Sequence, residues 1–414
     1  MTTTEPATTT ARRMPVTLSS FAVPYYPRLW ASGWLWNSTR WMSIFVGAYL
    51  VNQRTGSPLL VQLVGTIFYL PMFVGGLVAG SVSDRYDRRR TILRQLGVLA
   101  PLALLMSALL AFDAMPLGMI FVFMALVGVG GVVDMTSRRA LVHDLVGDKH
   151  LTNALALEMG SMSLGNMLGT LSGGAVLDFI GPAQVFLLIA GCYGAGFVLL
   201  LSMPAPARRG APAGGGSRLR ADLREGVRFF RTSTAVRSVL GITVAVNFFM
   251  FAFNPLVPVF AERLGLSAFS TGLLASATGL GMGIGSFGVA AAHPRRRGRV
   301  YLVGSFLSIA ALCGFAQSGL FPLSYALLVL TGIGGGMFGA TQSALVLSVT
   351  DPELRGRAMG LLSMAIGSLP FGMFMLGVAA ESLGPVTAVT ASSLGGLAFM
   401  IAWLKRRPET IRIA

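Results

Sequence analysis

Long apolar stretches alternate with short polar or charged segments along almost the whole chain. A helix needs about 20 apolar residues to cross the hydrocarbon core of a bilayer. Two apolar stretches, about 29–51 and 91–112, contain one arginine each, Arg40 and Arg94. The run 300–350 is long enough for two helices and is interrupted at 317–322. The pattern predicts twelve membrane-spanning helices, the others lying in the charge-free runs 55–83, 114–133, 159–177, 179–207, 238–261, 264–294, 358–380 and 382–404.

The composition agrees with this pattern. Of the 414 residues, 54% are hydrophobic and 12% are charged, whereas a soluble domain usually carries about 25% charged residues. The first ten residues are polar and rich in threonine, so we expect a tail rather than a signal peptide. The expected fold class is an all-α membrane protein.

The formal charge of +16 could indicate nucleic-acid binding. With twelve spans and a cytoplasmic N-terminus, however, all but three of the 32 Lys and Arg residues fall on the cytoplasmic side. The exceptions are Arg40 within the membrane and Arg54 and Arg263 outside it. This is the distribution that the positive-inside rule describes. We therefore expect no nucleic-acid partner and a multi-pass protein of the bacterial inner membrane with both termini in the cytoplasm.

The chain divides into two similar halves. ALVGVGGVVDMTSRRALV (125–142) aligns with VLTGIGGGMFGATQSALV (329–346), and AVLDFIGPAQVF (175–186) aligns with VAAESLGPVTAV (378–389). The second alignment has an offset of 203 residues. Parallel repeats related about the membrane normal occur in several transporter folds. The expected organisation is an N-terminal tail, two six-helix bundles separated by a Pro/Gly/Arg-rich cytoplasmic linker, and a C-terminal tail, at 1–24, 25–203, 204–237, 238–405 and 406–414.

The charged loop GSVSDRYDRRRTIL (80–93) carries a recognisable spacing. Gly80, Asp84, Arg85, Arg88 and Arg89 resemble the signature loop between spans 2 and 3 of major facilitator superfamily transporters. That signature usually has glycine where this chain has Asp87. The resemblance implies twelve helices in two pseudo-symmetric six-helix bundles that rock about a central cavity.

The resemblance also implies a conformational latch at the cytoplasmic ends of the helices. In the family, the loop aspartate acts against the start of span 11. The matching segment here contains Asp351, Arg355 and Arg357, with Asp351 and Pro352 suited to begin a helix. The alternative is that the arginines only fix the orientation of the loop in the membrane.

A second resemblance lies in span 5. Gly165, Gly169, Gly173 and Gly174 match the antiporter motif Gly-x-x-x-Gly-Pro-x-x-Gly-Gly, with Thr170 in place of proline. This segment is similar to bacterial siderophore and macrolide efflux members of the superfamily, and the motif is associated with export. The alternative is that these glycines only allow close helix packing.

Polar residues in the spans that line the cavity of this fold are candidates for a substrate or proton pathway. Asn37 and Arg40 share one face of span 1, Asn247 and Asn254 lie in span 7, and Gln342 lies in span 10. Pro255 and Pro258 predict a bend in span 7. A pocket with few charges, several aromatic residues and one arginine suits a bulky amphipathic molecule.

Two acids could pair with Arg40, namely Asp134 in span 4 and Glu158 in span 5. An arginine at the centre of a membrane costs about 2.5 to 3.5 kcal/mol on insertion scales, so it faces water or a carboxylate. A paired acid could carry a proton. Alternatively, Arg40 could bind an anionic substrate directly, or the ion pair could be only structural.

These features predict a monomeric secondary active transporter rather than an enzyme. The leading hypothesis is a proton-coupled exporter of a small amphipathic drug or siderophore, with the bilayer as its surroundings. The alternative is an uptake carrier or a transporter of lysolipids or anionic metabolites. A nucleotide-binding P-loop is absent from the sequence, which argues against an ATP-driven pump, and a channel or a receptor is a further alternative. The spacing of Cys192, Cys313 and the three histidines predicts no metal site, and we expect no cofactor and no catalytic residue.

Overall fold

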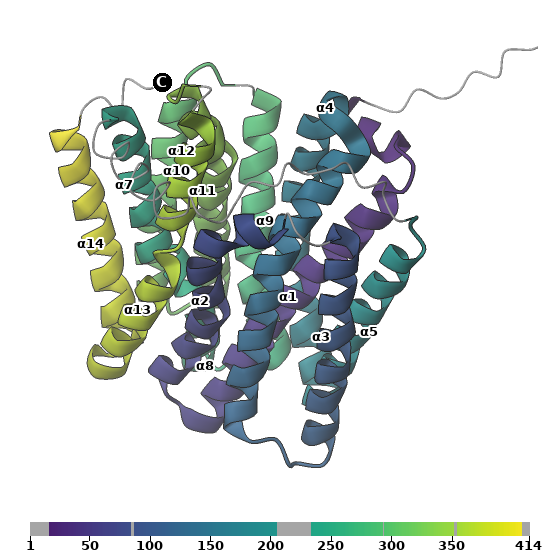
Figure 1. The fold of residues 1–414 in the computed structure, drawn as a ribbon. Helices are drawn as coiled ribbons and strands as arrows, with labels where there is room; N and C mark the ends of the chain where they lie inside the picture. The colour runs from purple at the N-terminus through teal and green to yellow at the C-terminus, as the bar shows by residue number, and fades with distance from the viewer. Residues whose placement is uncertain (1–15, 84–86, 205–232, 293, 352–353, 408–414) are drawn as a thin grey trace, which may run out of the picture.

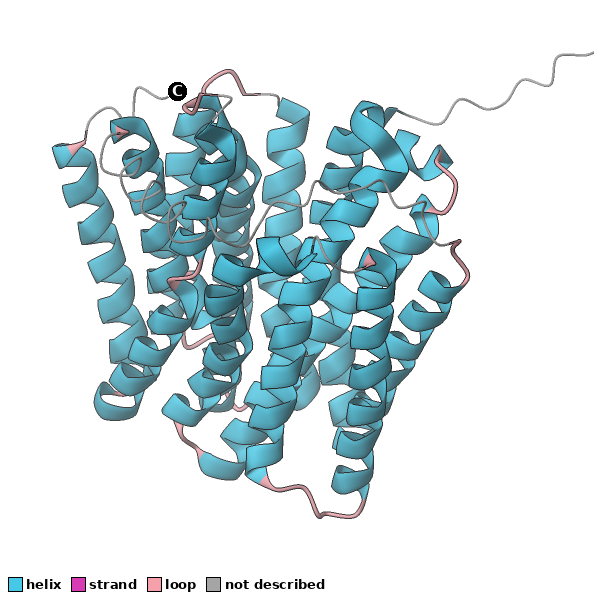
Figure 2. Cartoon of the chain, viewed as in Figure 1, coloured by secondary structure: helices cyan, strands magenta, loops and turns pink. Residues whose placement is uncertain are grey.

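A computed structural model describes residues 16–83, 87–204, 233–292, 294–351 and 354–407. Within these residues the chain is helical and contains no strand (Figure 2). The first half consists of η1 (Val16–Ala22), α1 (Tyr26–Thr55), α2 (Pro58–Ser83), α3 (Arg88–Ala111), α4 (Leu117–Phe179) and α5 (Pro182–Leu201). The linker expected at 204–237, apart from 204 and 233–237, lies outside the described residues, as do 1–15 of the N-terminal tail and 408–414 of the C-terminal tail.

The second half has more, and shorter, helices than the first. They are α7 (Thr234–Phe249), η2 (Phe251–Leu256), α8 (Val257–Arg263), α9 (Ala268–Ala292), α10 (Arg297–Gln317), α11 (Phe321–Ser348), α12 (Arg355–Ile366), α13 (Leu369–Leu383) and α14 (Pro385–Arg406). Span 7 is interrupted between α7 and α8, where the sequence predicts a bend at Pro255. Span 11 is also interrupted, between α12 and α13, which the sequence analysis did not predict.

Helix α4 contains two membrane spans. A straight helix of its 63 residues would measure about 95 Å, which is far longer than a bilayer core. Gly147 has a φ of +62° and a ψ of 179° inside this helix, a conformation that glycine adopts without the strain of a Cβ atom. The contacts with α1 show that the chain reverses there. Residues of α4 before Gly147, its first limb, contact α1 at decreasing residue numbers, Met124 at Gly47 and Arg138 at Gly33. Residues after Gly147, its second limb, contact α1 at increasing residue numbers, Leu157 at Trp30, Ser161 at Asn37 and Gly173 at Met42.

Twelve spans result from these helices. Among the described residues, nine helical stretches are long and apolar enough to cross a membrane, and Pro58–Phe73 of α2 is a shorter one. Helix α1 and the second limb of α4, which carry more polar residues, complete the twelve predicted from the sequence.

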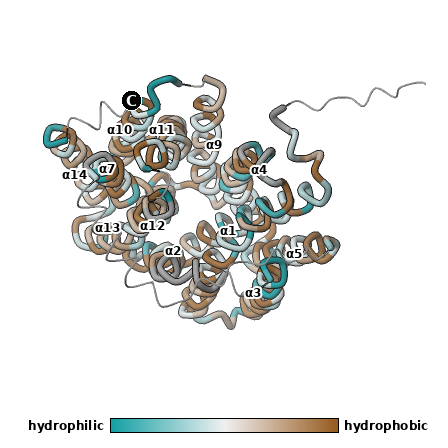
Figure 3. Tube along the Cα trace, turned by 45° about the horizontal axis from the view of Figure 1, so that its top comes forward, coloured by the Kyte–Doolittle hydropathy of each residue, from teal (hydrophilic) through white to brown (hydrophobic). Residues whose placement is uncertain are grey.

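The helices form two groups, with α1 to α5 in one and α7 to α14 in the other (Figure 1). The groups meet where α9 packs on α4 and where α13 packs on α2. Basic turns at the start of α3 and the end of α14 lie at the same end of the bundle (Figure 3). We call this the inner end, because the sequence predicts that it faces the cytoplasm, and the opposite end the outer end.

Part of the expected N-terminal tail is ordered against the first bundle. Ser20 of η1 donates from its backbone amide and its hydroxyl to Asn153 Oδ1, at 3.1 and 2.7 Å. The Phe21 ring packs edge-on against Trp30, with the ring centroids 5.3 Å apart. Residues 16–22 are therefore joined to the inner end of α4.

Candidate functional site

A pocket lies between the two halves and is lined by residues of both. It consists of two adjacent hollows with about 350 and 310 Å³ of space between the atoms, part of which is open to solvent. Asn166, Asn254 and Thr278 line both cavities. Two further threonines, Thr170 of α4 and Thr331 of α11, also line it, and none of the described lining residues is charged. The apolar and aromatic members include Trp41 and Phe45 of α1, Phe251 of η2, and Met282 of α9.

Asn254 reaches the pocket because span 7 is broken beside it. The helix α7 ends at Phe249, and the chain continues as the 3-10 helix η2, which contains Asn254 and Pro255. Proline has no backbone amide to donate and disrupts a continuous α-helix. The Pro255 ring lies against Gly65 of α2, at a place where an added Cβ would lie 2.6 Å from it. The sequence analysis placed Asn254 in the substrate pathway, and the structure places it in the pocket wall.

Asn166 is the pocket residue that the sequence analysis missed. Its side chain is buried, and its Oδ1 has no hydrogen-bond partner among the described residues. A buried polar group without a partner costs about 1–3 kcal/mol, so this carboxamide is suited to bind a polar group of a ligand. The sequence offered one signal for this role. Asn166 directly follows Gly165, which packs against α1, and neighbouring positions of a helix point to different faces.

Arg40 lies beside the pocket without an acidic partner. Its guanidinium is partly buried and lies over the ring of Trp41, 5.2 Å from the ring centroid. The buried Nε of Arg40 has no acceptor among the described residues. Tyr69 of α2 lies within its electrostatic reach. The ion pair that the sequence suggested, with Asp134 or Glu158, does not form.

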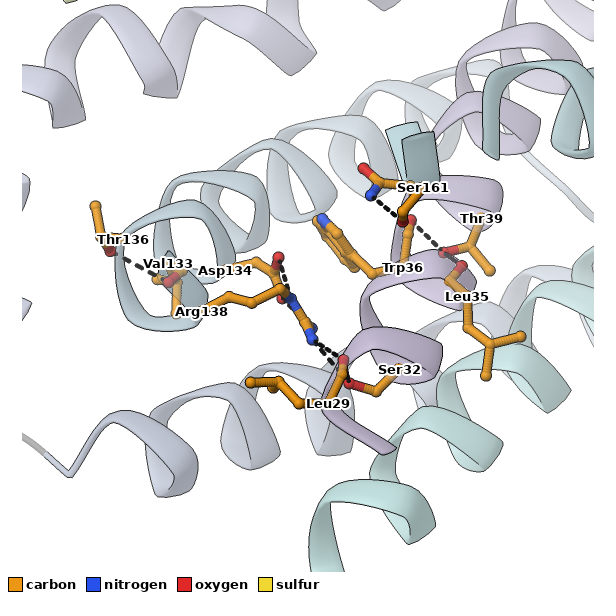
Figure 4. Close-up of polar contacts among 11 residues, drawn as sticks. Leu29, Ser32, Leu35, Trp36, Thr39, Val133, Asp134, Thr136, Arg138 and Ser161 are labelled. Carbon is orange, nitrogen blue, oxygen red and sulfur yellow. Dashed lines mark hydrogen bonds and ion pairs between the residues drawn. The ribbon is translucent and has the colours of Figure 1, made fainter. Parts of the chain in front are cut away.

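Asp134 is instead held by Arg138, one helical turn further along α4 (Figure 4). Arg138 Nη2 donates to Asp134 Oδ1 at 2.6 Å, and Arg138 Nε donates to Oδ2 at 2.9 Å. Arg138 Nη1 donates to the Leu29 carbonyl oxygen at 3.0 Å and to Ser32 Oγ at 2.7 Å. Both charged side chains are buried, with 5% and 6% of their surface exposed.

This pair corrects two expectations from the sequence. Arg138 was counted among the cytoplasmic residues, but its guanidinium is buried between α4 and α1. Gly33 of α1 makes room for it, since an added Cβ would lie 3.2 Å from Arg138 Cδ. Because Arg138 occupies the Asp134 carboxylate, Asp134 is not free to neutralise Arg40. The Asp134–Arg138 pair instead links α4 to α1.

Glu158 lies in the second limb of α4 near the same charged pair. It is partly buried and within electrostatic reach of Arg138, Arg139 and Asp134. It forms no ion pair with Arg40. Its carboxylate therefore lies in an environment that contains both charge signs, close to the inner end of the first bundle.

The other polar candidates lie inside the bundles. Asn247 Nδ2 donates to the Thr243 carbonyl oxygen at 2.8 Å, and Gln342 Nε2 donates to Thr243 Oγ1 at 3.2 Å. The Thr243 hydroxyl lies 2.9 Å from Tyr301 Oη, which donates to the Val239 carbonyl oxygen. These residues join α7, α10 and α11 and do not line the pocket, contrary to the expectation for Asn247 and Gln342.

Asn37 and the glycines of the antiporter-like motif form the contact between α1 and α4. Asn37 Nδ2 donates to Ser161 Oγ at 3.2 Å. An added Cβ at Gly165 would lie 2.7 Å from Asn37 Cβ, and one at Gly169 would lie 2.3 Å from the Ser38 carbonyl oxygen. Asn37 therefore packs in a helix joint rather than in the pocket wall.

The end of the motif reaches the other half. An added Cβ at Gly173 would lie 2.9 Å from Met42 of α1, whereas one at Gly174 would lie 2.8 Å from the Cα of Gly272 in α9. The hydroxyl of Thr170, which replaces the motif's proline, donates to the Asn166 carbonyl oxygen at 2.8 Å. The motif thus provides close approach both within the first bundle and between the halves.

The loop arginines make contacts within the first bundle. Arg88 forms an ion pair with Asp144 of α4 at 2.5 Å. Arg89 donates to the carbonyl oxygens of Leu200 and Leu201 at the end of α5, both at 2.8 Å. Asp87, at the position where the family signature has glycine, caps α3 by accepting from the Arg90 amide at 2.9 Å.

The latch itself falls largely outside the described residues. Asp84 and Arg85 are not described, nor are the side chain of Arg357 and the surroundings of Gly80 in α2. Asp351 and Arg355 are exposed. Residues 352 and 353, where Asp351 was expected to begin a helix, lie outside the described residues; α12 begins at Arg355, and the Leu354 amide donates to the Asp351 carbonyl oxygen at 2.9 Å.

At the outer end, polar bonds join the two halves. Asn52 at the end of α1 donates to Glu262 of α8 at 2.6 Å. Two further carboxylates, Asp178 and Glu381, accept hydrogen bonds from the opposite half. These bonds hold the two halves together on the outer side of the pocket.

Two helical bundles that enclose a central pocket, closed at one end by contacts between them, define a multi-pass membrane carrier. The family model "Major Facilitator Superfamily" matches residues 29–371 and 240–413. The chain belongs to this superfamily.

Known relatives and solved structures agree with this assignment. The chain is 28% identical over 360 residues to "Enterobactin exporter EntS" of Shigella boydii serotype 4 (strain Sb227), covering 83% of this chain and 82% of that protein. The same values hold for "Enterobactin exporter EntS" of Escherichia coli O139:H28 (strain E24377A / ETEC).

Among solved structures, a peptide transporter has a TM-score of 0.73 at 13% identity, covering 97% of this chain and 99% of its own. An inward-facing bacterial homolog of the human lysosomal transporter Spinster has a TM-score of 0.68 at 17% identity, covering 94% and 98%. These two structures share the fold.

Proposed function

We propose that this protein is a secondary active exporter that moves a small amphipathic molecule, such as a siderophore or a drug, out of the cell by alternating access. The observation that carries this proposal is the pocket lined by Asn166 and Thr278 from helices of opposite halves. A site shared between two halves changes its exposure when they rock about it. Closure at the outer end corresponds to a state in which substrate enters from the cytoplasm.

The direction of transport is inferred from the relatives. Proteins named as enterobactin exporters align over most of this chain. The glycine motif in span 5 resembles that of antiporters, and the same glycines form the joint between α4 and α1. Both features favour export over uptake.

The pocket supports an amphipathic substrate. Trp41, Phe45, Phe251 and Met282 provide apolar and aromatic surface, while carboxamides and hydroxyls provide hydrogen-bonding groups. Arg40 lies beside this surface without an ion pair, so we infer that it attracts an anionic or electron-rich part of the substrate.

We propose protons as the driving ion, with Glu158 as the carrier within the first bundle. Both carboxylate oxygens of Asp134 are bound by Arg138. Glu158 makes no comparable bidentate contact in the described structure, and a partly buried carboxyl can be tuned toward neutral pH.

The remaining expectations complete the proposal. The protein would act as a monomer in the bacterial inner membrane, with bundles at 25–203 and 238–405 and both termini in the cytoplasm. Asp84 would latch the inner ends against the segment that contains Asp351, Arg355 and Arg357 once the outer end opens. Arg88 and Arg89 would hold that loop on the first bundle.

Everted membrane vesicles from cells that produce the protein test this function. Acidification of the lumen by ATP hydrolysis should drive accumulation of enterobactin or ethidium several-fold above vesicles that lack the protein. Nigericin in potassium buffer should abolish the accumulation, because it collapses the pH gradient. Equal accumulation in both vesicle preparations, or uptake only in right-side-out vesicles, would contradict export.

A further inference from the structure

The outer end of the molecule contains two equivalent carboxylates in opposite halves. Asp178 lies near the end of α4, and Glu381 lies near the end of α13. The two acids occupy matching positions in the repeat that aligns 175–186 with 378–389. Each acid accepts hydrogen bonds from the half to which it does not belong.

The donors are equivalent as well. Asp178 Oδ2 accepts from the backbone amide of Phe269, the second residue of α9, at 3.3 Å. Glu381 Oε2 accepts from the backbone amide of Leu59, the second residue of α2, at 3.1 Å, and from Ser57 Oγ at 2.8 Å. A carboxylate of each half therefore caps the N-terminus of a helix in the other.

The local structure of the two capped helices is also the same. Ser57 precedes α2, and its Oγ accepts from the Leu60 amide at 3.2 Å. Ser267 precedes α9, and its Oγ accepts from the Ser270 amide at 3.3 Å. In both helices the amide of the second residue has no acceptor within its own helix, so it is available to the carboxylate across the interface.

Charge contributes to these contacts because the N-terminus of a helix carries a partial positive charge. No ion pair among the described residues neutralises either acid. Arg54 donates to the Met115 carbonyl oxygen, and the guanidinium of Arg263 lies over the Phe260 ring. The negative charge of each carboxylate is therefore directed at a helix terminus and a hydroxyl.

Other titratable groups lie at this interface. Tyr49 of α1 is within electrostatic reach of Asp178 and Glu262, and Glu262 accepts from Asn52. Asp113, in the loop between α3 and α4, is exposed and makes no bond to the second half. Asp178 and Glu262 therefore place two negative charges on the same side of the interface.

We propose that Asp178 and Glu381 form a symmetric pair of interfacial caps that hold the outer end closed. Each carboxylate binds a helix N-terminus of the other half, and this contact is lost when the outer ends of the halves separate, so removing either charge favours the open state. The proposal requires the rocking motion of the proposed function but not its direction or its substrate.

Distances between spin labels at the outer end test this proposal. Phe112→Cys and Leu320→Cys place one label on each half at exposed loop positions, in a background with Cys192→Ser and Cys313→Ser. At pH 8 the wild-type protein should give mainly the short distance. Asp178→Asn or Glu381→Gln should shift the closed-to-open ratio at pH 8 about two- to fivefold toward open, and the double variant about tenfold.

A matched control is available in Asp113→Asn, which removes an outer carboxylate that does not cross the interface. It should leave the distances unchanged. The proposal is overturned if the double variant matches the wild type at pH 8, or if the control shifts the distances equally. The distance measurement needs no substrate, so these outcomes do not depend on the vesicle assay.

Discussion

Asp134 and Arg138 lie four residues apart on α4, and their side chains form a buried ion pair with a closest distance of 2.6 Å. The remaining donors of the guanidinium bind the Leu29 carbonyl oxygen and Ser32 Oγ of α1. The pair therefore joins two helices of the first bundle. It also leaves Arg40 of α1 without a carboxylate partner.

Breaking this pair on one side should destabilise the protein strongly. Asp134→Ala leaves a buried guanidinium uncompensated, which costs about 3–5 kcal/mol. The thermal unfolding midpoint of the purified protein in detergent should fall well below that of the wild type. Replacing both partners, with Asp134→Leu and Arg138→Met, should recover most of the loss. An unchanged midpoint for Asp134→Ala would show that the pair is dispensable.

Substitution of Arg40 should affect transport rather than stability. Arg40→Gln removes a positive charge that has no ion pair in the described structure, so the unfolding midpoint should change little. If this charge contacts the substrate, the KM for transport should rise about tenfold, the value of one charge-assisted hydrogen bond. Arg94→Gln, at an exposed position of α3, is the control. Equal KM values for the wild type and Arg40→Gln would remove Arg40 from the site.

The glycine joint between α4 and α1 should tolerate no side chain at Gly169. Gly169→Ala would place a Cβ 2.3 Å from the Ser38 carbonyl oxygen, so the helices must separate, at a cost of about 1–3 kcal/mol. Gly191→Ala in α5 meets nothing within 4 Å and should be neutral or slightly stabilising, because alanine favours a helix. Similar unfolding midpoints for the two variants would contradict the packing role.

The polar network in the second bundle should be structural. Thr243→Val leaves the buried Gln342 amide without its acceptor, which costs about 1–3 kcal/mol, whereas KM should stay the same. The hydroxyl of Thr341 donates only to carbonyl oxygens of its own helix, so Thr341→Val should cost less. A raised KM without a loss of stability in Thr243→Val would return Gln342 and Asn247 to the substrate pathway.

The fold could be predicted from the sequence because its determinants are local. Charge-free runs of bilayer length gave the spans, and the break at 317–322 falls where α10 ends at Gln317 and α11 begins at Phe321. Pro255 predicted the break in span 7. The break between α12 and α13 was missed, since Gly367 and Ser368 occur equally well in continuous membrane helices.

The site was harder to predict because it depends on which face of each helix meets its neighbours. The sequence indicated Asn37, Arg40 and Asn254 equally as candidates for a substrate pathway, but only helix packing shows that Asn37 faces α4. Arg138 was assigned to the cytoplasm because basic residues usually lie there, and the space provided by Gly33 is invisible in the sequence. Asn166 was not recognised as a pocket residue because it lies between glycines that pack against other helices.

Alternating access requires one pocket that opens in turn to the two sides of the membrane. Asn254→Cys, in a background with Cys192→Ser and Cys313→Ser, places a single thiol in the pocket wall. A membrane-impermeant maleimide at pH 8 should label it in everted vesicles, where the inner side faces the reagent. It should also label it in right-side-out vesicles when Asp178→Asn and Glu381→Gln remove the caps of the outer end. Labelling from one side only, both with and without these two substitutions, would contradict alternating access.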